Sequence, residues 1–504
     1  MNINCPIMSE MNQNFSSRPV IILAACNSLQ TLHSDVLVLI CQLLCITCPQ
    51  SLKDLGRTCR RLHHFTVAFE YRILHLNSRL LITPMSPSLQ RYWDNVHCHA
   101  RHISILENLD WEIALPLLRG CQTISVIDWG VWGERDGYQR PETSRIPKLL
   151  QDVWPRAHLR LMNYPWPSKL RYNMYTYTLP TENIVYISTK AMKIRKRDFG
   201  PLGQVISNSL QLKLLHLDSM RGDQLWTGRR TPPIRELMMW DCTWTFTKEE
   251  TNAVWDFSQL QILDISGIDC AKEFFNSISG DSLNGLRKLV VTGKHDVRWG
   301  ECCSAQLNDL ISRSHLLEEL EIDCDLTLML IESIYRHAYL NKLKIHDFRG
   351  FGKDNIVCPT LTVGALEGLL ATCPRLRHLS LDLDWTTCNV EEFLRILARF
   401  LNLQYLNLRM RSRLHELGGN STSFDTDLEA VKQHVYILGS NKEGLGMITI
   451  TIRTAGYNEL TDRRTAEWDL QRKQGHIPER CFVFSWSEGG LGLVELSNSQ
   501  YRKA

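Results

Sequence analysis

One short apolar frame, repeated through the second half of the chain, limits what this sequence can fold into. The frame is six residues long, with apolar residues at its first, fourth and sixth positions. Because side chains alternate between the two faces of a β-strand, the fourth and sixth residues share one face, and each frame predicts a short strand. The frame occurs eight times in order, at Leu212/Leu215/Leu217, Ile234/Leu237/Met239, Leu260/Leu263/Ile265, Leu286/Leu289/Val291, Leu317/Leu320/Ile322, Leu340/Leu343/Ile345, Leu376/Leu379/Leu381 and Leu403/Leu406/Leu408.

The spacing of the frames predicts a repeat architecture. Consecutive frames begin between 22 and 36 residues apart. The intervening stretches predict helices, two of which open with the capping boxes Thr247-Lys-Glu-Glu250 and Asn389-Val-Glu-Glu392. Leucine-rich repeats have this strand signature and a period of ~20–29 residues. The pattern therefore predicts an α/β solenoid, a horseshoe with parallel strands on its concave face and helices outside.

The rest of the chain sets the expected domain boundaries. Residues 1–29 are polar and predict a flexible leader, followed by a helical module at 30–76. We expect degenerate repeats at 77–200, regular repeats at 201–412 and a capping region at 413–504, because the ends of an array need cover. The weaker frames lie at Ile103/Ile105, Ile124/Val126, Leu159/Leu161 and Val185/Ile187, and the capping strands are expected at Ile448/Ile450/Ile452 and Phe482-Val-Phe484.

Residues 30–76 have helical periodicity. A first helix over residues 31–44 is opened by Ser34 or Asp35, either of which can cap its first turn. This helix is apolar on nearly every side, and such a helix is normally buried all round. A piece of about 45 residues hides too little surface to bury it. We therefore expect its remaining apolar face to meet the rest of the chain or a second protein. A second helix is predicted by the spacing of Leu52, Leu55, Cys59 and Leu62.

The order and spacing of these residues resemble an F-box. The matching segments are Leu32-His-Ser-Asp-Val-Leu-x-x-Ile40-x-x-Leu43-Leu44, Leu52-x-x-Leu55-x-x-x-Cys59-Arg-Arg-Leu62 and Tyr71-Arg72. With repeats behind it, the chain is similar to fungal-type F-box/leucine-rich-repeat proteins. Cys373-Pro-Arg-Leu376 is similar to their cysteine-bearing repeat subtype. The chain departs from them at His33, where the family usually has a proline that pre-sets the first helical turn.

The resemblance implies a function. An F-box docks on the Skp adaptor of a cullin-based ubiquitin ligase, and the repeats present a protein substrate. The implied partners are the Skp adaptor, the cullin ligase core and an unknown substrate protein. A leucine-rich-repeat scaffold that engages no ligase is the alternative, favoured by His33. The implied adaptor-binding residues are Leu32, Val36, Leu37, Ile40, Leu43 and Leu44, with Leu52, Leu55, Cys59 and Leu62 in support.

Residues between the apolar positions of each frame project from the opposite face of the strands. Along the chain they run from aromatic through acidic to basic and mixed, a pattern that favours a specific protein ligand. Trp240 and Tyr405 are aromatic residues of the kind that anchor interfaces. The expected substrate-binding residues are Trp240, Glu321, Asp323, Lys344, His346, Asp382, Tyr405 and Arg409.

Composition excludes several other classes of protein. Lys and Arg total 57 and Asp and Glu total 54, a balance that excludes a strongly nucleic-acid-seeking surface. The longest nearly apolar run, Val36–Ile46, is shorter than the ~20 residues that span a membrane. The 17 cysteines lie mostly inside apolar patterns, so we expect reduced thiols in a cytosolic or nuclear protein. Lys193-Ile-Arg-Lys-Arg197 predicts a solvated turn or, less readily, a nuclear import signal.

No motif predicts a cofactor or a metal site. Cys45, Cys48, Cys59 and His63 have a spacing that zinc could use, and His97-Cys98-His99 has no further ligand nearby. Cys59 already has a place in an apolar helical pattern, so we interpret these residues as structural.

No known catalytic signature is present either, and we expect a chain that is not an enzyme. Asp323-x-Asp325 and Asp382-x-Asp384 resemble paired carboxylates, but alternate strand positions are expected to face solvent. A hydrolase within residues 130–200 or 440–504, which are rich in Trp and Tyr, is the third class that stays open.

Overall fold

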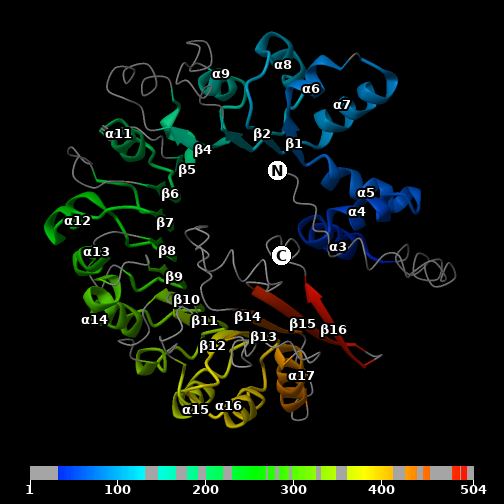
Figure 1. Cartoon of the computed structure of the whole chain (residues 1–504). Coiled ribbons are helices and arrows are strands. Elements are labelled where there is room, and N and C mark those ends of the chain that lie inside the picture. Colours follow the sequence, from blue (N-terminus) through cyan, green and yellow to red (C-terminus); the bar gives the residue numbers. More distant parts are fainter. Residues whose placement is uncertain are drawn as a thin grey trace, which may run out of the picture. The chain divides into compact units, whose positions relative to one another are not determined.

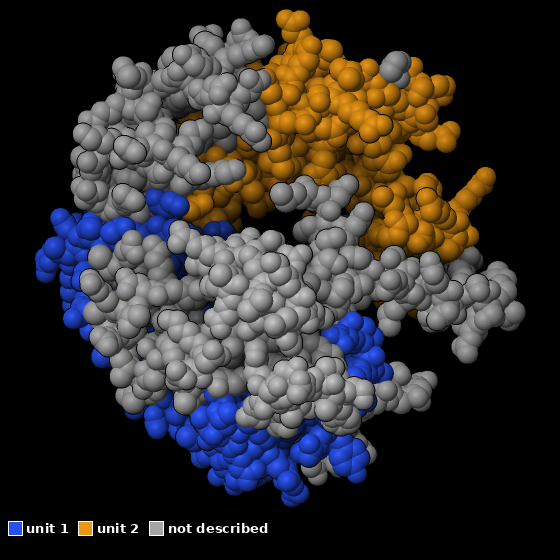
Figure 2. Space-filling view, viewed as in Figure 1, with its two compact units in different colours: residues 1–7, 219–223, 233–504 blue, residues 8–218, 224–232 orange. Residues whose placement is uncertain are grey.

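A computed structural model gives the arrangement of the chain (Figure 1). It describes residues 32–83, 85–130, 146–165, 179–190, 200–219, 230–267, 271–278, 283–293, 298–324, 331–347, 360–411, 426–439, 447–453, 479–487 and 490–496. The chain forms two compact units, coloured separately in Figure 2. Unit 2 contains residues 8–218 and 224–232, and unit 1 contains residues 1–7, 219–223 and 233–504.

The described part of unit 2 starts with three helices and continues as alternating strands and helices. Its strands pair in chain order, all parallel: β1 (Ile73–Leu76), β2 (His102–Ile105), β3 (Val126–Trp129), β4 (His158–Pro165), β5 (Ile184–Lys190) and β6 (Leu214–Asp218). Its helices are α3 (Ser34–Thr47), α4 (Pro49–Gly56), α5 (Arg60–Glu70), α6 (Ser78–Ile82), α7 (Pro87–His99), α8 (Trp111–Leu118), α9 (Ile146–Val153), η4 (Thr181–Asn183) and α11 (Gly200–Asn208).

The weaker frames of unit 2 are confirmed in part. Ile103 and Ile105 are buried in β2, as Leu159 and Leu161 are in β4. In the other two frames, Ile124 and Ile187 are buried as predicted, but Val126 and Val185 are not. The buried strand residues are Ile127 and Trp129 in β3 and Ile184 and Ile187 in β5, so Val126 and Val185 belong to the opposite, half-buried face.

The N-terminal module contains three helices that pack on one another. The prediction of one helix through Leu52, Leu55, Cys59 and Leu62 is wrong, because the chain is extended at Cys59 between α4 and α5. Gly56 ends α4 where a Cβ would collide with the Thr66 hydroxyl of α5. The predicted cap of α3 is also wrong: the helix starts at Ser34, and the His33 ring accepts a hydrogen bond from the Asp35 N–H, at 3.4 Å.

Unit 1 continues the strand–helix alternation. Its parallel strands are β7 (Glu236–Trp240), β8 (Ile262–Ser266), β9 (Lys288–Thr292), β10 (Glu319–Cys324), β11 (Lys342–Asp347), β12 (His378–Leu383), β13 (Tyr405–Arg411) and β14 (Met447–Arg453). Two antiparallel strands follow, β15 (Glu479–Ser487) and β16 (Gly490–Leu496). The helices are α12 (Lys248–Val254), α13 (Ala271–Ser277), α14 (Arg298–Arg313), η8 (Ile331–Ser333), α15 (Val363–Thr372), α16 (Val390–Leu397) and α17 (Thr426–Gly439).

All eight strong frames are confirmed. Each contributes its fourth and sixth residues to one of the strands β6–β13, and all 24 apolar positions are buried. The helices of unit 1 lie along one side of its strands (Figure 1). The Thr247–Glu250 capping box is present in full at α12, and the Asn389 side chain caps α16. The chain is therefore an α/β array of parallel strands in repeated units, as the pattern predicts.

Several predictions from the sequence are not tested by the described residues. The leader at residues 1–29, the basic stretch Lys193–Arg197 and Asp325 lie outside the described residues. The domain borders at residues 76, 200 and 412 stay predictions, whereas the two compact units divide mainly near residue 218. In the part of the chain that the structure describes, no helix combines the length and apolar character needed to cross a membrane.

Candidate functional site

Helix α3 presents an apolar stripe to solvent. Leu37 and Cys41 face the rest of the module and are buried. On the other side, the exposed fractions are 41% for Val36, 62% for Leu39, 62% for Leu43 and 83% for Ile46. These four residues, called the α3 stripe below, are spaced three, four and three apart, and therefore line one side of the helix. Contiguous exposed apolar residues of this kind mark interaction surfaces.

The residues expected to bind an adaptor divide into three groups. Val36 and Leu43 are exposed, and Leu32, Ile40, Leu44, Leu55 and Cys59 are half-buried. The prediction that Leu37, Leu52 and Leu62 contact a partner directly is wrong, because all three are buried. They hold the helices of the module together. Sequence reasoning missed Leu39 and Ile46, although their spacing from Val36 and Leu43 was a usable signal.

Two cysteines of this module, Cys48 and Cys59, have local hydrogen-bond partners. The Cys59 thiol caps α5 by accepting from the Leu62 N–H at 3.5 Å. The Cys48 thiol lies 2.9 Å from the Ser51 hydroxyl, a hydrogen bond that lowers the pKa of Cys48. No group of three or more His, Cys, Asp or Glu residues within the described ranges is arranged to hold a metal.

The second candidate site lies on the polar face of the unit 1 strands, opposite the buried frame residues. Here the acidic strand β10 lies between β9 and β11, and parallel pairing sets its acids beside bases of both neighbours. The Lys288 ammonium of β9 lies 3.0 Å from the Glu319 carboxylate of β10, and the Lys342 ammonium of β11 lies 2.7 Å from the Glu321 carboxylate. Burial raises the pKa of Glu321, but its hydrogen bond to Lys342 outweighs this and lowers the pKa. This part of the face is charge-balanced across strands.

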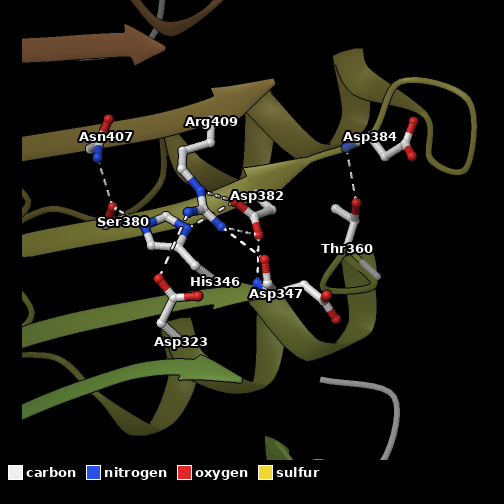
Figure 3. Close-up of polar contacts among 9 residues, drawn as sticks. All are labelled: Asp323, His346, Asp347, Thr360, Ser380, Asp382, Asp384, Asn407 and Arg409. Atoms are coloured by element: carbon white, nitrogen blue, oxygen red, sulfur yellow. Dashed lines mark hydrogen bonds and ion pairs between the residues drawn. The ribbon is translucent and has the colours of Figure 1, made fainter. Parts of the chain in front are cut away.

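Farther along the same strands, register aligns a polar row. Asp323 pairs with His346 across β10 and β11, and Asp382 pairs with Arg409 across β12 and β13. The Arg409 guanidinium contacts the Asp382 carboxylate through Nε at 2.6 Å and through a terminal nitrogen at 2.8 Å (Figure 3). A second terminal nitrogen lies 3.9 Å from Asp323. Four of the eight predicted substrate-binding residues therefore meet in one place.

His346 connects this row to a neighbouring serine. Its Nδ1 lies 2.8 Å from the Asp382 carboxylate, and its Nε2 lies 2.8 Å from the Ser380 hydroxyl. The Asn407 side-chain amide donates to the same hydroxyl at 2.9 Å, and the Asp347 N–H donates to Asp382 at 2.7 Å (Figure 3). These residues are called the polar cluster below: Asp323, His346, Asp347, Ser380, Asp382, Asn407 and Arg409.

Burial and neighbouring charge fix the protonation states in the polar cluster. Burial raises the pKa of Asp382, but Arg409 and His346 outweigh it and hold the pKa well below its usual range. Burial lowers the pKa of His346 to about 4, against the opposing attraction of Asp382. At neutral pH, Asp382 is thus an anion and His346 is neutral. Since the carboxylate can only accept, Nδ1 of His346 carries the proton and Nε2 accepts from Ser380.

Several predictions of solvent exposure are wrong on this face. His346, Asp382 and Arg409 are 1%, 3% and 7% exposed, because their side chains interlock across three strands. Asp384 is also buried, and it accepts hydrogen bonds from the N–H and hydroxyl of Thr386 rather than pairing with Asp382. Glu321, Asp323 and Lys344 are half-buried, whereas Trp240 and Tyr405 are each 42% exposed. The binding roles of all eight residues stay predictions.

The expected substrate-binding residues did not include Ser380, Asn407 or Asp347, although alternation within the frames places Ser380 and Asn407 on the polar face. Ser380 and Asn407 lie in the middle polar position of their frames, in register with Lys344 of β11. Aligning successive frames would have set Ser380 diagonally beside His346. A separation of 34 positions in sequence concealed that contact, and neither Ser380 nor Asn407 carries a charge.

Comparison with known proteins adds little. No protein-family model matches the sequence, and no curated protein is similar to it. Among solved structures, the chain is similar to the leucine-rich repeat-containing protein LegL7 from Legionella pneumophila, at 9% sequence identity and a TM-score of 0.19. The match covers 82% of this chain and 95% of that chain. A match with so low a TM-score does not indicate a function. The function is therefore proposed from the geometry of this chain.

Proposed function

We propose that this chain is the substrate-recognition adaptor of a Skp–cullin–F-box ubiquitin ligase. In this proposal α3, α4 and α5 are an F-box that docks on the Skp adaptor, and the repeats are leucine-rich repeats that bind a target protein. The observation that carries the proposal is the α3 stripe. Helix α3 is apolar on most sides, and one of its faces is exposed in the described structure. That face carries Val36, Leu39, Leu43 and Ile46.

The energetics favour a protein partner for this stripe. Burying an exposed Leu, Ile or Val side chain contributes ~1.5–3 kcal/mol, so four such residues can supply much of the affinity of a stable complex. Leu37 and Cys41 anchor the opposite side of α3, and the Arg61 guanidinium holds the carbonyl of Leu32 at 2.7 Å. The stripe is therefore presented on a helix that is already fixed, which lowers the entropic cost of binding.

The proposed mechanism is proximity. One end of the chain binds the ligase, and the polar face of unit 1 binds the target, so the target's local concentration near the ligase rises without bond chemistry by this chain. Trp240 and Tyr405 are the exposed aromatic side chains on that face that suit hot-spot contacts. The Tyr405 ring stacks on His378 with centroids 4.4 Å apart, which holds it in place.

A second candidate function is a repeat scaffold that binds proteins but engages no ligase. The specific observation in its favour is His33, which stands at the entry of α3 in place of the proline usual in F-boxes. The His33–Asp35 hydrogen bond is long, at 3.4 Å, and exposed. The first turn of α3 is therefore less firmly set than a proline would make it.

Affinity capture with separable variants distinguishes the two functions. The full chain should capture the Skp adaptor and cullin from cells. Val36→Asp/Leu43→Asp should lose both while keeping the target proteins, and Trp240→Ser/Tyr405→Ser should keep both while losing targets. Leu401→Asp changes a leucine that is 90% exposed outside α3 and serves as the matched control. Absence of the Skp adaptor from every folded variant, wild type included, would establish the scaffold instead.

A further inference from the structure

The polar cluster contains an arrangement that binding alone does not require. Ser380, His346 and Asp382 form a chain of two hydrogen bonds, each 2.8 Å long, from hydroxyl to imidazole to carboxylate. We propose that Ser380 is a nucleophile for activated carboxylic esters, with His346 as its general base and Asp382 as the residue that orients the base. This activity is independent of the proposed adaptor function.

Geometry supports these roles. A nucleophile within hydrogen-bond reach of a base, with the base held by a third group, is the arrangement that activates a serine in unrelated folds. The tautomer is the required one, since Asp382 accepts from Nδ1 and leaves the Nε2 lone pair toward the Ser380 hydroxyl. Arg409 and the Asp347 N–H fix the Asp382 carboxylate in this position (Figure 3).

Accessibility also fits. His346 and Asp382 are buried, whereas Ser380 is half-buried. A buried base beside a hydroxyl on a less buried residue is compatible with acyl transfer at that hydroxyl.

Asn407 provides a second indication of a ligand. Its amide nitrogen donates to Ser380, while its Oδ1 atom is buried and has no hydrogen-bond partner among the described residues. An unsatisfied buried acceptor is uncommon and calls for a ligand or a water. The Asn407 N–H group beside Oγ is also a donor of the kind that stabilises an oxyanion. Lys344, in register with Ser380 on β11, adds positive charge next to it.

The proposed reaction is the hydrolysis of an ester through an acyl-serine intermediate. Ser380 Oγ attacks the ester carbonyl carbon and forms a C–O bond, while its proton passes to His346 Nε2. The tetrahedral oxyanion then collapses, the bond to the leaving alcohol breaks, and that alcohol takes the proton from Nε2. Water, activated by the same nitrogen, hydrolyses the acyl-serine to a carboxylic acid. Burial and Arg409 make His346 a weak base, which restricts the reaction to esters with good leaving groups.

An alkyl fluorophosphonate tests the proposal on the full chain. It should form a phosphonyl bond to Ser380 Oγ with release of fluoride and a proton, detected as added mass on the peptide that contains Ser380. Ser380→Ala should lose the label, and His346→Gln should react ~100-fold more slowly or worse. Ser266→Ala removes another hydroxyl from the same polar face, where it hydrogen-bonds to Asp264, and should label as wild type does.

The pH dependence separates an activated serine from an ordinary one. With His346 unprotonated above pH 5, the labelling rate should be flat between pH 5 and 8. A hydroxyl that reacts only as its alkoxide speeds up tenfold per pH unit. Circular dichroism confirms that each variant is folded. Absence of label on Ser380 in the folded wild type, equal rates in wild type and His346→Gln, or a rate that rises tenfold per pH unit would each overturn the proposal.

Discussion

Asp382 and Arg409 are charged side chains in the interior of unit 1, and each depends on the other. The desolvation of a buried ion costs several kcal/mol and is offset only by good pairing geometry. Asp382 has that pairing from two nitrogens of Arg409, from the Asp347 N–H and from His346. Removing one member should therefore leave another buried without its partner.

Replacing Arg409 tests this dependence. We expect Arg409→Met to lower the free energy of unfolding by ~3–5 kcal/mol, because it leaves the Asp382 carboxylate uncompensated. Arg377→Met, which changes an exposed arginine just before β12, should stay within ~0.5 kcal/mol of wild type. Urea unfolding followed by circular dichroism measures both. Equal, small shifts would show that Arg409 contributes no more than a surface arginine.

Mild acid should weaken the fold through His346. Its folded pKa of about 4 lies below its ordinary value of 6.5, so the unfolded chain takes up a proton first as the pH falls. The associated stability is complete above pH 6.5 and is lost progressively toward pH 4, by ~2 kcal/mol at pH 5. Asp382 contributes a loss only below its ordinary pKa of 3.8, so it does not affect this window.

The measurement is urea unfolding at pH 7 and pH 5 for wild type and His346→Gln. Wild type should lose ~2 kcal/mol more than the variant does over this interval. The variant should retain a smaller slope, because burial also lowers the pKa of His337 and His378. Identical slopes in the two proteins would mean that His346 is not titrated in this way.

At the scale of single residues, the sequence predicts which side chains share a face but not how deeply they are buried. Alternation within each frame is enough to group Asp323, His346, Asp382 and Arg409 on the polar face. Their burial depends on contacts between strands 23 to 36 residues apart in sequence, which a local pattern does not contain. For the same reason, the sequence places Ser380 on this face but does not show that it lies beside His346.

At the scale of elements, the eight strands and the capped start of α12 were predictable, whereas the cap of α3 was not. Thr247 accepts from the Glu250 N–H at 3.2 Å while Glu250 accepts from the Thr247 N–H at 2.8 Å, as the capping box predicts. Helix breaks were harder. The apolar spacing of residues 52–62 runs unbroken across the junction of α4 and α5, and the close approach of Gly56 to Thr66 is a tertiary contact.

The capping box at the start of α12 should stabilise the fold by a measurable free energy. We expect Thr247→Ala to lower the free energy of unfolding by ~1 kcal/mol, because it leaves an amide at the start of α12 without its side-chain acceptor. Lys248→Ala, one residue later and also exposed, is the control and should change stability by less than ~0.5 kcal/mol. Urea midpoints of the two variants decide; a loss no larger for Thr247→Ala than for Lys248→Ala would contradict the cap.

At the scale of the whole molecule, the repeat order was predictable because each frame must stack on its neighbours to bury its leucines. The parallel pairing of successive strands follows from that requirement. The reversal at β15 and β16 does not, since the apolar alternation in Phe482-Val-Phe484 is the same for either strand direction. Periodicity also does not show that α3 keeps four apolar residues exposed.

The account as a whole depends on what covers the α3 stripe. Direct titration of the purified full chain with a Skp adaptor, by calorimetry, is the measurement that tests it. We expect saturable one-to-one binding by wild type and by Leu401→Asp, and a loss of at least ~10-fold in affinity for Leu43→Asp, because a charge replaces an interfacial leucine. No binding by the folded wild type, or equal binding by Leu43→Asp, would contradict the account.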